Sequence, residues 1–333
     1  MTDPPPAEWS PDPRRFLEDV EAKPAYAAAL SGSRRLHEAV DRIDSSVRSV
    51  LFLGMGSSRY AALDTARWLR GAGVWAVAEY ASAVTLPPPQ RELLVVAVSA
   101  SGQSAETVAA TERYAGIACT VAVTEDPASV LAQGCDLFLP LEAGVEAGGV
   151  ACRSFLHTGL VLRLLEARLS GRPIDFARLC GTVAEASADL LERRSDWLSG
   201  VSDLLDGPDG VHCIAPAERW SCAAQSALML REGPRRSATA SETGDWNHVD
   251  VYLTKTTDYR ALLMTGSPYD DEALEWLRAR GSTVVTLGGK HRDVAATVQH
   301  RGSADPDVAV HVDTLVAELL AARWWRAEPP RPG

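Results

Sequence analysis

Short apolar runs alternate with amphipathic stretches along most of the chain. In the first half, runs rich in Val, Leu and Ala predict strands, and the mixed segments between them predict helices. The predicted strands are 49–55, 74–80, 92–99, 119–124 and 137–141, and the predicted helices are 57–71 and 104–114. Strands that alternate with helices pair in parallel and carry helices on both faces of the sheet. The first half therefore predicts a doubly wound α/β unit.

The second half repeats this rhythm after two predicted helices around 151–169 and 175–199. Its predicted strands are 211–215, 260–265, 283–287 and 308–312, and its predicted helices are 218–232, 271–280 and 313–325. We expect two tandem α/β units of flavodoxin-like type, each a five-stranded parallel sheet flanked by helices. The expected divisions are a disordered N-terminus at 1–13, a helical segment at 14–47, a first domain at 48–170, a helical connection at 171–205, a second domain at 206–326 and a tail at 327–333.

One strand–turn–helix passage stands out for its hydroxyl groups. Residues 94–107 read LVVAVSASGQSAET, which places Ser99, Ser101 and Ser104 around Gly102. Such a turn gathers free backbone N–H groups and hydroxyls at the positive end of a helix, where a phosphate binds well. No Gly-Lys-Ser/Thr and no G-x-G-x-x-G follows, so neither a P-loop nor a dinucleotide site is indicated. An ordinary Ser-rich turn is the alternative.

A second turn follows the first predicted strand and contains Gly56, Ser57 and Ser58. Ligands of open parallel sheets bind at the carboxyl ends of the strands, and both turns begin there. Gly56, Ser57, Gly102 and the neighbouring Gln103 are therefore predicted to line a substrate pocket.

Bulk properties narrow the class of protein. The chain has 333 residues, 46% of them hydrophobic, and a formal net charge of −11, which argues against nucleic acid and anionic membranes as partners. No apolar run is long enough for a membrane span, and the start of the chain does not resemble a signal peptide. The six cysteines are scattered and the histidines lack ligand-like spacing. We expect a cytoplasmic protein without a metal or other cofactor.

Several segments resemble the sugar isomerase (SIS) domain family. They are GMGSS at 54–58, AEYAS at 78–82, SASGQSAET at 99–107, AGVEAGGVACRSF at 143–155, LREG at 230–233 and SETGDWNH at 241–248. Within the family, the chain resembles the isomerase half of glucosamine-6-phosphate synthase from about residue 50 to 320. The resemblance implies two SIS units, a hexose 6-phosphate ligand and a homodimer.

The resemblance also implies residue roles. Ser58, Ser99, Ser101 and Ser104 would hold the phosphate. Glu232 falls on the catalytic base of the synthase. His248 falls on the histidine that opens the sugar ring, which the family supplies from the neighbouring subunit.

Departures from the synthase pattern change the expected chemistry. Met229 replaces a lysine and Gln225 a glutamate, on the helix face that also carries Glu232. We expect neither a glutaminase domain nor the C-terminal lysine that forms an imine with a ketose. Apolar Met229 is expected to raise the pKa of Glu232 by desolvation. Glu146 either caps the following helix or lines the pocket, and we favour the pocket.

These features predict an enzyme of the glucosamine 6-phosphate and N-acetylglucosamine 6-phosphate class. It would open the sugar ring and abstract the C2 proton, and loss of the amine (a deaminase or deglycase) is the favoured outcome. One alternative is a dehydratase that eliminates the 3-hydroxyl of N-acetylglucosamine 6-phosphate. Others are a plain aldose–ketose isomerase and a sensor that binds a sugar phosphate without catalysis.

Overall fold

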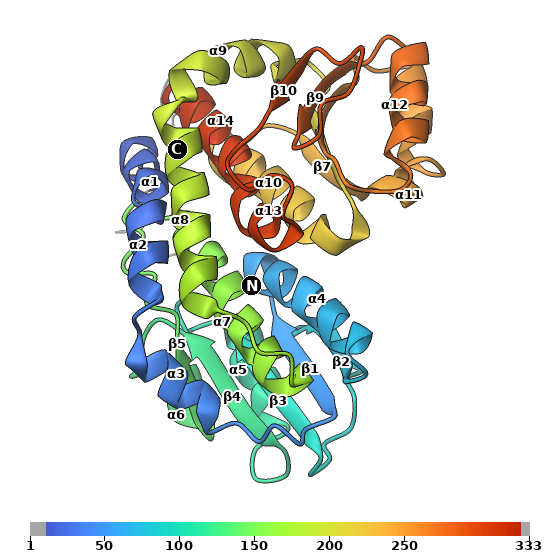
Figure 1. The fold of residues 1–333 in the computed structure, drawn as a ribbon. Helices are drawn as coiled ribbons and strands as arrows, with labels where there is room; N and C mark the ends of the chain where they lie inside the picture. The colour runs from blue at the N-terminus through green and yellow to red at the C-terminus, as the bar shows by residue number, and fades with distance from the viewer. Residues whose placement is uncertain (1–10, 328–333) are drawn as a thin grey trace. The chain divides into compact units, whose positions relative to one another are not determined.

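The computed structural model describes residues 11–327, which group into two compact units (Figure 1). The first unit contains residues 25–144 and 154–184. The second contains residues 11–24, 145–153 and 185–327. The domain limits expected from the sequence stay a prediction.

The first unit is built on a parallel sheet with strand order β2-β1-β3-β4-β5. The strands are β1 (Ser49–Gly54), β2 (Trp75–Tyr80), β3 (Leu93–Val98), β4 (Cys119–Thr124) and β5 (Leu137–Pro140). The order is that of a flavodoxin-like sheet, as predicted. Every residue of the central strand β3 is buried, because helices cover both faces of a parallel sheet.

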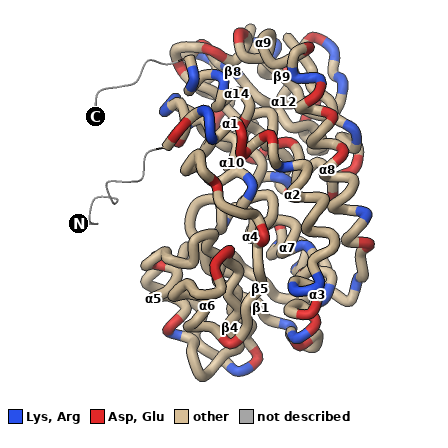
Figure 2. Tube along the Cα trace, turned by 90° about the vertical axis from the view of Figure 1, so that its left-hand side faces the viewer, with Lys and Arg blue, Asp and Glu red and all other residues tan. Residues whose placement is uncertain are grey.

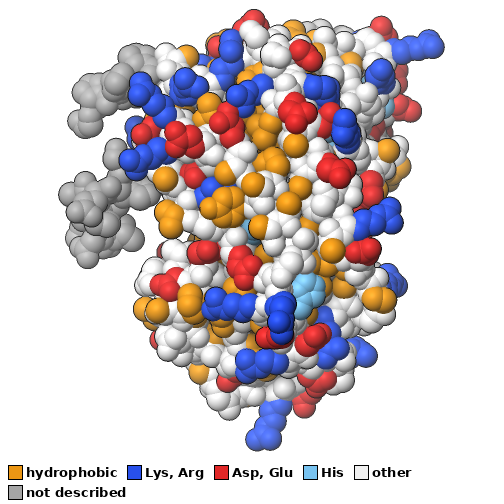
Figure 3. Space-filling view, turned by 60° about the vertical axis from the view of Figure 1, so that its left-hand side comes forward, with side chains coloured by type: hydrophobic (Ala, Val, Ile, Leu, Met, Phe, Trp, Pro, Cys, Tyr) orange, Lys and Arg blue, Asp and Glu red, His pale blue; other side chains and the backbone are white. Residues whose placement is uncertain are grey.

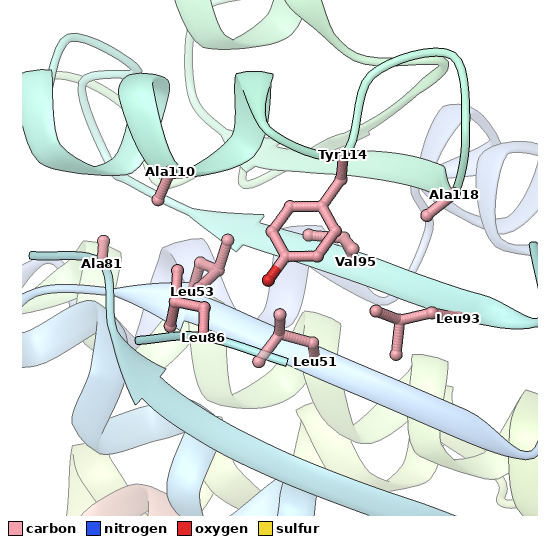
Figure 4. Packing of buried hydrophobic residues seen from close by; sticks show 9 residues of the cluster. All are labelled: Leu51, Leu53, Ala81, Leu86, Leu93, Val95, Ala110, Tyr114 and Ala118. Carbon is pink, nitrogen blue, oxygen red and sulfur yellow. The ribbon is translucent and has the colours of Figure 1, made fainter. Parts of the chain in front are cut away.

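Helices of this part of the chain are α2 (Lys23–Leu30), α3 (Arg34–Asp41), α4 (Gly56–Gly71), α5 (Ala105–Glu112), α6 (Val130–Gly134), α7 (Arg153–Ser170) and α8 (Phe176–Glu192). Tyr114, just after α5, packs its buried ring against Leu51, Leu53 and Val95 of the sheet (Figure 4). Its hydroxyl donates to the carbonyl oxygen of Pro87 at 2.7 Å. The polar end of the ring therefore has a partner while its body fills the core.

The second unit repeats the topology, with strand order β10-β9-β8-β6-β7. Its strands are β6 (Val211–Ala215), β7 (Ala238–Glu242), β8 (Arg260–Met264), β9 (Thr283–Leu287) and β10 (Ala296–Val298). Its helices are α1 (Pro13–Glu21), α9 (Arg194–Leu205), α10 (Trp220–Glu232), α11 (Thr243–Trp246), α12 (Asp270–Ala279), α13 (Pro306–Val312) and α14 (Thr314–Ala327), with 3₁₀ turns η1 (Ala217–Arg219) and η2 (Asp250–Lys255).

The strand predicted at 308–312 is wrong, because these residues form α13. Asp305 caps this helix and Pro306 occupies its first turn, a start signal that outweighs the β-branched run behind it. The fifth-strand position is instead taken by β10, and β7 was also not predicted. Both are short strands at the edges of the sheet, where half-exposed polar residues hide the strand pattern.

The described residues contain no helix long and apolar enough to cross a membrane. Within residues 11–327, no three His, Cys, Asp or Glu side chains are placed to hold a metal ion. Basic and acidic residues are interspersed along the chain rather than gathered into one basic stripe (Figure 2).

Candidate active site

The turn between β3 and α5 is held in one conformation by its own side chains. Ser104 caps α5: its Oγ accepts from the Thr107 backbone N–H at 3.3 Å and donates to Glu106 Oε2 at 3.1 Å. Gly102 has a φ of +66°, and a Cβ there would overlap the Ser129 side chain. Only glycine therefore fits at the tightest point of the turn.

This turn presents hydrogen-bond donors that no protein group uses. Within residues 11–327, the Ser99 hydroxyl makes no hydrogen bond, and the backbone N–H groups of Ala100, Ser101 and Ser104 find no acceptor. The Ser101 hydroxyl accepts from the Gln103 N–H at 3.2 Å and still has its own proton to donate. Unused donors at the start of a helix are suited to an anion.

The turn between β1 and α4 lies beside the first turn. A Cβ on Gly54 would lie 3.2 Å from the carbonyl oxygen of Val98, at the end of the neighbouring strand. Gly56 begins α4 with a φ of +49°, and the half-buried Ser57 and Ser58 follow in its first turn. The structure thus brings the predicted phosphate-binding residues together, and we call Gly56–Ser58 and Ser99–Ser104 the hydroxyl cradle.

Arg59 was not singled out from the sequence, although it follows Ser58 directly. Its guanidinium lies 3.8 Å from the centre of the Tyr80 ring at the end of β2. No ion-pair partner of Arg59 exists among the described residues, and its Nε is buried without a hydrogen bond. The available signal was its position in the sequence, because it directly follows Ser58 in the first turn of α4.

In the second unit, α10 carries Gln225 and Met229, which differ from the synthase, and Glu232, which matches its catalytic base. Gln225 and Met229 are buried and touch, with Gln225 Nε2 3.5 Å from Met229 Sδ, which confirms that they share a helix face. Gln225 Nε2 also donates to the Ala151 carbonyl at 2.9 Å, while its Oε1 is buried without a partner. This wall of the helix is uncharged.

Glu232 is the last residue of α10, and its side chain is exposed. Neighbouring protein atoms nevertheless exclude enough water to raise the pKa of its carboxyl group above the usual value. The charge of Glu146 raises that pKa further, and Arg231 lowers it. The direction agrees with the sequence-based expectation, and Glu146 is a contributor that the sequence did not suggest.

Glu146 caps α7. Its Oε1 accepts from the backbone N–H groups of Cys152 and Arg153, both at 2.6 Å. These two bonds satisfy backbone N–H groups at the start of α7 that have no acceptor within the helix. The capping interpretation therefore describes the contacts of Glu146, and its contact with substrate stays a prediction.

A buried acid that sequence reasoning missed holds this segment in place. Asp19 of α1 accepts from the Gly148 N–H at 2.7 Å and pairs with Arg153 at 3.2 Å. A Cβ on Gly148 would overlap the backbone of Phe16, so the two segments pack closely. Asp19 lies on the buried face of an amphipathic helix with Phe16 and Val20, and an acid on that face was the available signal.

His248 follows α11 and is exposed. Its segment is anchored by Trp246, a buried residue whose Nε1 donates to the Tyr259 hydroxyl at 2.7 Å. Val249, Tyr252 and Leu253 beside it are 56%, 62% and 39% exposed. The histidine therefore projects from a firmly held segment that exposes three apolar side chains beside the charged Asp245 and Lys255.

The hydroxyl cradle belongs entirely to the first unit, whereas Glu146, Gln225, Met229, Glu232 and His248 belong to the second. In the second unit Gln225 contacts Met229 and Glu146 influences the pKa of Glu232, whereas no contact within residues 11–327 joins His248 to any of them. Their joint role at one substrate stays a prediction.

The comparisons with known proteins cover residues of both units. Residues 45–167 match the family model for the SIS domain. Glutamine–fructose-6-phosphate aminotransferase (isomerizing) of Aeropyrum pernix is 27% identical over 307 residues, covering 84% of this chain and 49% of that protein. The enzyme of the same name from Thermococcus kodakarensis is 29% identical over 310 residues, which cover 85% of this chain and 50% of that protein. The chain spans about half the length of these curated relatives.

Solved structures share the whole fold. The C-terminal domain of glucosamine-fructose-6-phosphate aminotransferase from Francisella tularensis superposes with a TM-score of 0.81 at 18% identity, covering 94% of this chain and 95% of that one. Tagatose-6-phosphate ketose/aldose isomerase from Escherichia coli gives 0.78 at 17% identity, covering 96% and 95%. Glucosamine-6-phosphate deaminase from Thermotoga maritima gives 0.70 at 18% identity, covering 94% of each chain.

Proposed function

We propose that this chain, which contains an SIS domain at residues 45–167, is an enzyme that removes the amine from an amino-sugar 6-phosphate. The hydroxyl cradle would hold the phosphate, and Glu232 would move the C2 proton. The names of the relatives and structural neighbours describe enzymes that act on hexose phosphates or amino-sugar phosphates. This similarity supports the substrate class, and the residues of this chain support the reaction.

The proposed reaction needs one base and a ring-opening group. His248 would assist opening of the ring, which gives a C1 aldehyde and makes the C2 proton acidic. Glu232 would take that proton from C2 and return it to C1, leaving an imine at C2. Water then adds to the imine to give a carbinolamine, which loses ammonia and leaves a ketose 6-phosphate as the product. General acid–base assistance of this kind contributes about 10²–10⁴-fold to the rate.

The observation that carries this proposal is the environment of Glu232. Its pKa is raised by desolvation, with a further contribution from Glu146, and the wall of α10 before it is uncharged. The C1 aldehyde of an opened amino aldose acidifies the C2 proton by itself. An amino aldose needs no lysine, and this chain has only three. Lys23 is buried against Glu318 at 2.6 Å, which removes it from imine chemistry.

Incubation of the full chain with glucosamine 6-phosphate tests the proposal, with ammonia and ketose 6-phosphate as readouts. Parallel incubation with N-acetylglucosamine 6-phosphate tests the dehydratase alternative, since elimination of the 3-hydroxyl produces an ultraviolet-absorbing enal. Exchange of the C2 hydrogen in deuterium oxide detects proton abstraction even without turnover. Absence of exchange and of product from both sugars contradicts the catalytic proposal and favours a binding protein.

Glu232→Gln should lower kcat/KM for ammonia release by about 10²–10⁴-fold, because the amide cannot accept the proton. Glu275→Gln on α12 is the matched control, since Glu275 is an exposed carboxylate of the same unit and should leave the rate unchanged. Because the base must be ionised, the acid side of the pH–rate profile should lie above the usual range of a glutamate. A profile with its acid limb in the usual range contradicts the role of Glu232.

We further propose that the enzyme is a homodimer in which His248 serves the neighbouring subunit. The exposed apolar side chains around His248 are the support, because a protein surface of this kind is typically covered by a partner. Mixing inactive Glu232→Gln with inactive His248→Ala should restore about a quarter of the wild-type activity if each site draws on two subunits. If no activity returns after the subunits have exchanged, Glu232 and His248 of the same subunit serve one site, and this part of the proposal is wrong.

A further inference from the structure

A cavity in the second unit, outside the proposed active-site residues, combines an apolar floor with an arginine-rich rim. It has a volume of about 630 Å³ and lies among α1, α9 and α14. Leu17, Leu198, Leu319 and the buried Trp324 form the floor. Pockets of about 300–1,000 Å³ with mostly apolar walls and a few polar groups are typical small-molecule sites. On the side of the molecule turned forward in Figure 3, charged and hydrophobic side chains are closely interspersed.

The rim has more positive charge than its own acids neutralise. Arg194 pairs with Glu21 at 2.5 Å, and Arg236 pairs with Asp206 while its guanidinium lies 4.4 Å from the centre of the Trp324 ring. These two arginines are already satisfied. The charge available to a ligand comes from the remaining rim residues.

Three rim residues are left with unbalanced charge. Arg323 donates to the neutral hydroxyls of Ser202 and Ser199, both at 3.2 Å, and Arg326 has no partner among residues 11–327. The only opposing charge is Asp203, whose carboxylate also lacks an ion-pair partner within the described range. Two arginines against one aspartate leave one uncompensated positive charge, in a chain whose net charge is −11.

We infer that this cavity binds a small amphipathic monoanion. The apolar or aromatic body of the ligand would lie on the floor formed by the leucines and Trp324, and its single acidic group would lie between Arg323 and Arg326. Guanidinium groups bind carboxylates, phosphates and sulfonates strongly because several N–H donors converge on the anion. None of the residues proposed for catalysis lines this cavity, so the inference does not depend on the proposed reaction.

A matched pair of fluorescent probes tests the charge requirement. 8-Anilinonaphthalene-1-sulfonate and N-phenyl-1-naphthylamine share the aromatic body, and only the first carries an anion. We expect Arg326→Gln to weaken sulfonate binding by about tenfold and to leave the neutral probe unchanged. Asp203→Asn should have the opposite sign and tighten sulfonate binding by roughly threefold. Arg292→Gln, an exposed arginine outside the cavity, is the control.

The location is tested by filling the cavity. Ala327 is exposed at its rim, so Ala327→Trp can block the opening without disturbing the core. It should abolish the high-affinity sulfonate signal, with the melting temperature confirming that the variant is folded. Equal binding of both probes, or sulfonate binding that responds to Ser99→Ala and not to Arg326→Gln, overturns the inference. Activity on sugar phosphates is not a readout here, so failure of the proposed function leaves this result unaffected.

Discussion

The two sheets have the same topology, but their carboxyl edges have opposite character. In the first unit, the turns after β1 and β3 present hydroxyls and backbone N–H groups that have no partner among residues 11–327. In the second unit, the equivalent turns after β6 and β8 are closed by an internal ion pair. Arg219, at the end of η1, pairs with Asp313 and donates to the Thr265 carbonyl. Asp313 also contacts His300 at 3.1 Å, and its side chain is 1% exposed.

The same strand-end hydroxyl shows the difference most directly. Ser99 directly follows β3 and has an unused Oγ, whereas Thr265 directly follows β8 and its Oγ1 donates to the Leu287 carbonyl at 3.0 Å and accepts from the Gly289 N–H at 2.6 Å. One edge is therefore available to an anion, and the other is filled by the chain's own arginine. A repeated fold offers the same place for a ligand twice, and the side chains decide where a ligand can bind.

The closed edge is the place for the largest stability effect. Asp313→Asn leaves the buried Arg219 without a counter-charge, and the loss of a buried partner typically costs about 3–5 kcal/mol. Asp293→Asn is the matched control, because Asp293 forms an exposed pair with Arg278 at 3.3 Å and should cost less than about 0.5 kcal/mol. Urea unfolding of both variants measures the difference. Equal stability of the two variants contradicts the view that the second edge is closed by this ion pair.

The open edge depends on the shape of its turn. Gly102→Ala adds a Cβ that overlaps Ser129 and forces alanine into the left-handed region, at a cost of about 2–3 kcal/mol. Gly116→Ala has the same left-handed strain, with φ of +73°, but meets open space and should cost about 1 kcal/mol. Thermal unfolding separates the two. Titration with inorganic phosphate should show weakened binding only for Gly102→Ala, and unchanged binding would contradict the location of the cradle.

Individual serines sharpen the comparison further. Ser104→Ala removes the cap of α5 and should cost about 1 kcal/mol as well as weakening phosphate binding. Ser101→Ala should weaken phosphate binding with little loss of stability, because the Ser101 side chain is exposed and only accepts from Gln103. The measurements are the same unfolding and titration experiments. If both variants bind phosphate as well as the wild type does, the turn is an ordinary Ser-rich connection and not a phosphate site.

The smallest effect concerns the pH dependence of the closed edge. Asp270 accepts from the N–H groups of Gly266 and Ser267, yet burial raises its pKa above the usual value. A carboxyl group with a raised folded-state pKa contributes stability below its unfolded-state pKa, and this contribution is lost as the pH rises through the folded-state pKa. Asp270→Asn should therefore gain stability relative to the wild type as the pH rises from 4 toward neutrality. Parallel curves for the two proteins contradict this assignment.

Patterns within short stretches were enough for much of the molecule. All five strands of the first sheet were predicted from short apolar runs, and four of these strands contain β-branched residues. The hydroxyl cradle was also predicted, because each of its two groups of serines directly follows the strand that positions it. Residues close together in the sequence form a turn of this kind, so the sequence alone was sufficient to predict where its hydroxyls gather.

Contacts between residues far apart in the sequence could not be predicted and became visible only in the tertiary structure. Asp19 meets Arg153, and Arg219 meets Asp313, across separations that no periodicity or motif reports. The same holds for the position of Glu146 near Glu232, which changes the pKa of a group 86 residues away along the chain. The amino-acid sequence determined the type of fold and the place where the hydroxyls of the cradle gather. The chain's packing decided which edge is open and which carboxyl group has a raised pKa, because burial and charge depend on every segment that lies nearby.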